Sequence, residues 1–90
     1  MSEKRRPSMN ISWILSHLRE AQEELTGTID RIGTEEGYGE IEFEIAIAHL
    51  YSHINTAWNS RFVDDVDIAS LSEDDFYKWR AFPSDISLGK

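Results

Sequence analysis

The sequence predicts an all-α fold, an antiparallel helical hairpin followed by a short C-terminal helix. Two long segments, roughly residues 10–32 and 40–61, carry apolar residues at helical spacing, and a glycine-rich segment joins them. A third segment, residues 73–80, begins with a helix-start signal and ends before Pro83. Because two long helices rarely close a core by themselves, we expect two copies to form a four-helix-bundle-like homodimer.

The length and composition indicate one small domain. A chain of 90 residues buries only roughly 60–65% of the surface that its unfolded form exposes, and the absence of cysteine rules out stabilisation by disulfides. We expect a flexible N-terminal tail at residues 1–9, a single helical domain at 10–82 and a C-terminal tail at 83–90. Any further stabilisation must therefore come from packing, including packing against a second copy.

The charge distribution argues against nucleic acid as a partner. The net charge is −8, and after residue 6 the chain carries 16 acidic and 6 basic residues, a balance of about −10. Nucleic-acid binding draws most of its affinity from lysine and arginine at the phosphates, so an acidic body disfavours it. No apolar run reaches the length of a membrane span, and a cytoplasmic protein without membrane contact is the expectation.

The first long helix is expected from an apolar stripe with a seven-residue recurrence. Asn10 or Ser8 is placed to cap its first turn, and Gly33 stands where a left-handed residue would end it. The residues of the seven-residue series are Ile11, Leu18, Leu25 and Ile32. This pattern is typical of an amphipathic helix with one apolar side.

The second long helix begins with the ambiguous stretch EIEFEIAI. Its alternation of acidic and apolar residues is typical of a strand, but a strand of more than twenty residues is implausible. Farther along, helical spacing places these apolar residues on one face: Phe43, Ile47, Leu50, Ile54, Ala57 and Trp58. The helix is therefore preferred, and Ile41, Ile45 and Ala48 then form a second apolar face that something else must cover.

The C-terminal part predicts an extended connection and a short helix. Residues 62–70 are acidic and carry no clear period, so we expect an extended segment there. Ser72 and Asp75 have the spacing of a capping box, which predicts a helix start. The aromatic residues Phe76, Trp79 and Phe82 follow, and we expect this cluster to cover the second apolar face of the preceding helix.

Three histidines are the best candidates for chemistry. His49 and His53 are four residues apart, a spacing that places both rings on one helical face. In an antiparallel hairpin, only His53 is level with His17. We weigh three interpretations: boundary histidines with ordinary hydrogen bonds, which we prefer, a pH-sensitive contact, and a metal site built from His17, Glu20, His49 and His53.

Other catalytic signals are missing, so we expect no enzyme and no cofactor. The sequence contains no cysteine, no G-x-S-x-G elbow and no G-x-x-x-x-G-K phosphate loop. Trp13 lies nearly opposite the apolar stripe, where it is either covered by the C-terminal segment or open to a partner. We expect an interaction or adaptor protein whose contact surface includes Trp13, His17, Tyr51, Trp58 and Arg61, with a metal-binding helical bundle as the alternative.

Overall fold

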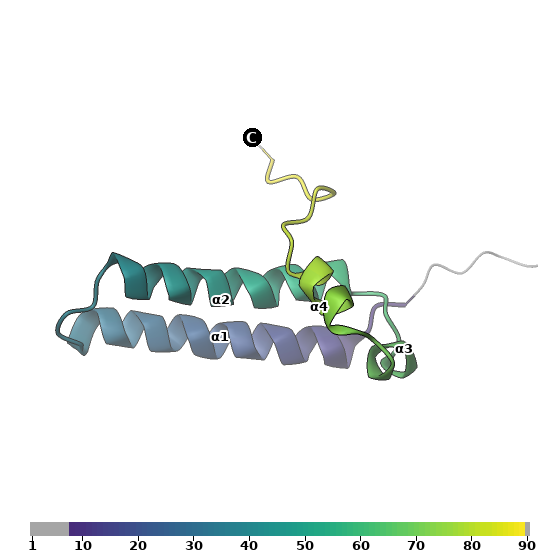
Figure 1. Cartoon of the computed structure of the whole chain (residues 1–90), viewed down its shortest axis with the longest axis horizontal. Coiled ribbons are helices and arrows are strands. Elements are labelled where there is room, and N and C mark those ends of the chain that lie inside the picture. The colour runs from purple at the N-terminus through teal and green to yellow at the C-terminus, as the bar shows by residue number, and fades with distance from the viewer. Residues whose placement is uncertain (1–7, 90) are drawn as a thin grey trace, which may run out of the picture.

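The computed structural model describes residues 8–89 and is all-helical over that range. Helices α1 (Ile11–Thr34) and α2 (Glu40–Asn59) lie side by side and antiparallel, which confirms the predicted hairpin (Figure 1). Two short helices, α3 (Asp65–Ala69) and α4 (Glu73–Trp79), lie at the end of the hairpin where α1 begins and α2 ends. Residues 1–7 of the expected N-terminal tail lie outside the described residues.

Helix α1 begins where the sequence predicts and ends later. The Asn10 side chain accepts a hydrogen bond from the Trp13 N–H, at 3.2 Å, and so caps the first turn. The expected stop at Gly33 is wrong, because Gly33 continues the helix and the Glu35 N–H still donates to the Arg31 carbonyl at 2.8 Å. The reversal of the chain is instead made at Gly37, whose φ of +77° is a conformation that favours glycine.

The alternating stretch EIEFEIAI is helical and forms the first part of α2. Its first turn starts at Gly39, whose N–H donates to Glu42 Oε1 at 3.0 Å, and Glu40 and Glu42 meet the positive end of the helix dipole. The helix ends at Asn59, two residues before the predicted end, with Ser60 as its C-cap. The Ser60 hydroxyl turns back to donate to the Thr56 carbonyl, which satisfies a carbonyl of the last turn.

Small residues form the contact between α1 and α2. The buried residues of the two helices are Ala21, Thr28, Ala46, Asn55, Thr56 and Ala57, of which Asn55 faces the end of α4. Small side chains let two helices approach closely, but they bury little apolar area. The large aliphatic residues of both helices therefore lie beside this contact, and none of them is fully buried in the described part of the chain.

The connection at residues 62–70 differs from its prediction. It contains the helix α3 where an extended segment was expected, because Asp64 provides an N-cap position and the Ile68 N–H closes a first turn on the Asp64 carbonyl. Asn10 ties this connection to the start of α1, since its Nδ2 donates to the Val63 carbonyl at 2.8 Å and to Asp65 Oδ1 at 2.9 Å. The connection thus stays at one end of the hairpin.

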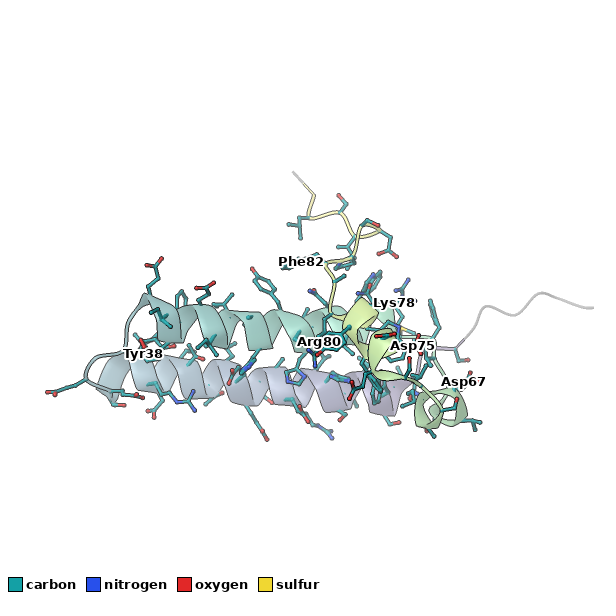
Figure 2. The ribbon with its side chains drawn as sticks, in the orientation of Figure 1. Tyr38, Asp67, Asp75, Lys78, Arg80 and Phe82 are labelled. Carbon is teal, nitrogen blue, oxygen red and sulfur yellow. The ribbon has the colours of Figure 1, made fainter. Side chains whose placement is uncertain are left out.

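Helix α4 begins as predicted but packs elsewhere. Asp75 accepts from the Ser72 N–H at 3.2 Å, which confirms the helix start, and the last helical residue is Trp79 (Figure 2). The expected cover of the second apolar face is wrong, because Ile41 and Ile45 remain 71% and 53% exposed. The short connection after α2 holds α4 against the C-terminal half of α2, far from these two residues.

Two asparagines of α2 hold the end of α4. Asn59 Nδ2 donates to the carbonyls of Trp79 and Ala81, both at 2.8 Å. Asn55, which is buried, donates to the Arg80 carbonyl at 2.9 Å. Since carbonyls at a helix C-terminus have no partner within the helix, these amides supply the missing donors.

We predict that Asn59→Ala lowers the free energy of unfolding by about 1–2 kcal/mol, because two hydrogen bonds at the end of α4 are lost. Asn55→Ala, which removes one such bond, should cost less. Urea titrations followed by tryptophan fluorescence measure both, since Trp13, Trp58 and Trp79 all lie at this end of the hairpin. Unchanged unfolding in both variants would mean that aromatic packing alone holds α4.

Candidate functional site

The hairpin has two dissimilar sides, and each carries residues of functional interest. One side carries a histidine track, defined as His17, Glu20, Glu24, His49 and His53. The other side carries an apolar face, defined as Ile11, Leu15, Leu18, Leu25, Ile29, Ile32, Phe43 and Ile54. The contact between α1 and α2 runs between the two sides.

Trp13 lies at the α4 end of the histidine track and is half-buried. Its indole Nε1 donates to Ser60 Oγ at 2.7 Å, and its ring meets the Trp79 ring edge-on with centroids 6.4 Å apart. Phe76 continues the cluster at 5.5 Å from Trp79. The sequence left two alternatives for Trp13, and the structure shows the first: Trp13 is covered from the C-terminal side, by helix α4. Trp13 thus joins α1, α2 and α4.

His17 and His53 lie face to face between α1 and α2. Their Nδ1 atoms are 3.2 Å apart, which confirms that these two histidines are level in the hairpin. The edge of Trp13 packs on His17 with centroids 4.5 Å apart. A hydrogen bond between two Nδ1 atoms requires one ring to donate its proton and the other to offer a lone pair, so the pair cannot be made by two imidazolium rings.

The two histidines of α2 also meet carboxylates of α1. His53 Nε2 lies 3.3 Å from Glu20, and His49 Nδ1 lies 3.0 Å from Glu24. The His49 side chain is 65% exposed, so its contact with Glu24 is mostly solvated and contributes little. His49 therefore stands apart from the His17–His53 pair, although its spacing from His53 suggested a shared role.

The metal site suggested by the sequence is only partly assembled. Among the described residues, no three histidine, aspartate or glutamate side chains converge on a common point. The Nδ1 atoms of His17 and His53 do converge, but Glu20 approaches His53 at the opposite nitrogen and His49 is engaged by Glu24. The arrangement offers two nitrogens, fewer than the three protein ligands of a usual zinc site, and the metal-binding bundle stays a hypothesis.

The environment of His17 lowers its pKa below the ordinary value of 6.5. Burial is the main cause, because removal from water disfavours the imidazolium form. The nearby charge of His53 acts in the same direction, while Glu20 opposes both. The neutral ring that the His17–His53 hydrogen bond needs is therefore favoured by the protein around it.

Residues 80–89, which follow α4 and form the C-terminal segment, are anchored near the end of α2. Asp85 accepts from Trp58 Nε1 at 2.8 Å and lies 3.6 Å from the Arg61 guanidinium, which itself stacks on the Trp58 ring at 3.7 Å. The hydrogen bond from Trp58 is the main reason that the pKa of Asp85 is lowered. Phe82 packs on Tyr51 with centroids 4.9 Å apart, beyond α4 along α2 (Figure 2).

The apolar face is concave at its α4 end. A cavity of about 360 Å³ opens there between α1, α2 and the C-terminal segment, and Trp58 and Arg61 stand at its border. Its other lining residues are Met9, Ile11, Ile14, Leu15, Leu18, Ile54, Ala57 and Ile86. Of the residues expected in a contact surface, Trp58 and Arg61 adjoin the apolar face, whereas Trp13 and His17 lie on the other side of the hairpin.

The sequence predicts an apolar stripe on α1, but it does not show that the stripe lies beside the contact with α2 and not within it. The signal that reveals this position is a second row of small residues beside the stripe. Ala21 and Thr28 on α1, with Ala46 and Ala57 on α2, take the interhelical contact. Small residues allow the closest approach of two backbones, so the bulky stripe rotates outward.

Comparisons with protein-family models, with curated proteins and with solved structures find no match for this chain. In the part of the chain that the structure describes, none of the helices combines the length and apolarity needed to cross a bilayer. The structure itself defines the class of protein: an all-α helical hairpin. A short helix packs on one end of the hairpin, and a large apolar face is exposed.

We predict that the stability of the protein falls as the pH drops from 7.5 to 5.5. His17 has a lowered pKa in the folded chain, so the unfolded chain takes up its proton first as the pH falls through about 6.5. The contribution of the neutral His17 to the free energy of unfolding is complete above that pH. Below it, this contribution declines by less than about 1.4 kcal/mol per pH unit. Urea titrations at several pH values measure the slope.

The slope should shrink in His17→Gln, which cannot titrate, and should persist in His49→Gln, whose position on the surface makes it the matched control. An equal slope in His17→Gln and the unaltered protein would contradict the assignment of this pH dependence to His17.

Proposed function

We propose that this protein is a non-enzymatic interaction module that acts as a homodimer, with the apolar face as its contact surface. The observation that carries the proposal is the burial pattern. Ala21, Ala46 and Ala57 are the buried apolar residues of the described chain, while all eight residues of the apolar face are at least 40% exposed. A contiguous apolar patch of this size on a small protein is typical of a site of association.

The area of the apolar face suits a stable dimer. Its eight side chains are 40–66% exposed. Each therefore offers roughly 100 Å², and together they offer on the order of 800 Å², about the area that each partner contributes to a standard interface. Burial of such side chains gains about 25 cal/mol for each Å² of apolar surface removed from water. Association thus supplies the large apolar core that the hairpin lacks.

The charges of the chain favour contact through this face and disfavour it elsewhere. The net charge of −8 makes two copies repel, and their repulsion is smallest where no acid lies between them. On α1, the positions that carry the apolar face from Ile11 to Ile32 include no charged residue. The acids Glu20 and Glu24 project from the histidine side instead. A second copy is therefore the occupant that we propose.

Residues at the rim of the contact are assigned from their positions. Trp58 and Arg61 border the concave end of the apolar face. Tyr51, with nearly half of its surface exposed, lies two turns before Trp58 on α2 and packs on Phe82. Aromatic and arginine side chains are common anchors in protein interfaces. Trp13 and His17 take a supporting role in this proposal, since they hold α1, α2 and α4 together.

We predict that Ile29→Glu converts the dimer to monomer, because it places a charge within the apolar face, at one of its most exposed residues. Ile41→Glu is the matched control. Ile29 and Ile41 are similarly exposed, at 66% and 71%, but Ile41 lies on the outer side of α2. Sedimentation equilibrium measures both variants, and circular dichroism verifies that both keep their helix content.

The proposed homodimer is contradicted if the unaltered protein sediments as a monomer at micromolar concentrations. It is also contradicted if the two substitutions weaken the dimer equally, since the contact would then not depend on the apolar face.

A further inference from the structure

Helix α1 carries a complete coiled-coil seam on its exposed side. In a coiled coil, residues named a and d recur every seven residues, separated by alternating steps of three and four. The a positions of α1 are Leu15, Gln22 and Ile29, and the d positions are Ile11, Leu18, Leu25 and Ile32. We call these seven residues the seam. The pattern extends from the first turn of α1 to its last.

The seam is only partly covered within the described chain. All seven of its residues are exposed. The contact with α2 uses other positions, with Ala21 and Thr28 buried and His17 partly so. An a and d seam is the surface by which one helix packs against another, with each side chain inserted between four of the facing helix. Its exposure therefore identifies a missing helix of matching periodicity.

We propose that the missing helix is α1 of a second copy, aligned antiparallel along the seam. This inference rests on the proposed homodimer and specifies how its two copies meet. A two-fold axis crosses the seam near its middle, so that each α1 lies along the other and α2 flanks it. The hairpin loops then point in opposite directions, and the assembly is a four-helix bundle with antiparallel neighbours.

The helix dipoles favour the antiparallel alignment. Charge alone does not distinguish the two alignments, because both ends of the hairpin are equally acidic. Residues 30–44, around the loop, and residues 61–75, at the other end, each contain one base and six acids. The antiparallel alignment places opposite ends of the helix dipoles side by side, which is favourable, whereas a parallel alignment places like ends together.

The shape of the apolar face favours the same alignment. The cavity of about 360 Å³ lies at the start of α1, near Leu15 and Leu18. At the other end of the seam, Ile29 and Ile32 are among its most exposed side chains. With the two helices overlapped nearly in full, Leu18 faces Ile29 of the second copy and Leu15 faces Ile32. Each concave end thus receives the projecting end of the other copy.

Gln22 gives this pairing a preferred alignment. It is the single polar residue of the seam and lies near its middle. In the antiparallel pairing, each Gln22 faces Leu25 of the other copy, and the two amides lie about 4.5 Å apart along the axis. They are therefore within reach of each other across the two-fold axis. A displaced pairing separates the amides and leaves one or both without a partner, at a cost.

Cysteine cross-linking tests the alignment, because the native chain has no cysteine. Leu18→Cys and Ile29→Cys are made as separate proteins, mixed, exchanged and oxidised in a glutathione buffer. We expect a covalent dimer in the mixture and none in either protein alone. Like positions lie about 16 Å apart in the antiparallel pairing, whereas a disulfide needs Cα atoms within about 7 Å.

A second measurement leaves the seam intact. A nitroxide label on Glu36→Cys, in the loop, should give an interspin distance of about 35 Å or more by pulsed electron resonance, because the antiparallel pairing places the two loops at opposite ends. A short distance between the labels, or self-linking of Leu18→Cys alone, would establish a parallel pairing and overturn this proposal.

The failure of this inference is distinguishable from failure of the proposed homodimer. Sedimentation of the labelled Glu36→Cys protein reports the oligomeric state directly. A dimer in which neither cysteine pair links, alone or mixed, would keep the homodimer and remove the α1 seam as its contact. A monomer would overturn both proposals, and the partner of the apolar face would then have to be a different protein.

Discussion

The close contact of small side chains between α1 and α2 determines most of the other features of this structure. Ala21 and Thr28 of α1 and Ala46 and Ala57 of α2 are buried, whereas the large aliphatic residues of both helices are not, so the two helices approach along their least bulky surfaces. The bulky aliphatic residues then have no room between the helices and lie to one side. Replacing the small residues with larger ones would overpack this contact, which typically costs 1–3 kcal/mol. The open apolar face is therefore a consequence of how the hairpin itself packs.

Polar contacts hold the opposite side of the hairpin and are concentrated at one end. The bonds of Trp13 to Ser60, of His17 to His53 and of Asn59 to the end of α4 all lie in the half where α1 begins and α2 ends. The first two join α1 to α2 or its C-cap and require a particular alignment of donor and acceptor, so they specify how far α2 is displaced along α1. Exposed contacts such as that of His49 with Glu24 add little to this. The alignment of the hairpin is thus decided near α4, where all three tryptophans lie.

The sequence predicted the helices better than it predicted their faces. Periodicity and capping residues identified α1, α2 and α4, and counting from the loop placed His17 level with His53, because these depend on local spacing alone. The position of α4 was missed, since it depends on where asparagines of α2 find carbonyl partners. The helix α3 was missed because its five residues are too short to show a period and its start depends on Asp64. The outward rotation of the stripe was missed because periodicity identifies an apolar side without saying what covers it.

The energetics of such a small fold support the association surface that we propose. The described hairpin buries only small and polar residues, and the free energy gained by burying them must still exceed the conformational entropy lost on ordering two long helices. Large apolar side chains supply most of that gain in ordinary domains, and here they contribute it only partly until another surface covers them. Folding and association are coupled under these conditions, since whatever binds the folded chain stabilises it. The composition of the seam restricts which surface can cover it. The seam carries no acid, so the binding free energy must come from an apolar partner. That partner must also offer a hydrogen bond to the amide of Gln22.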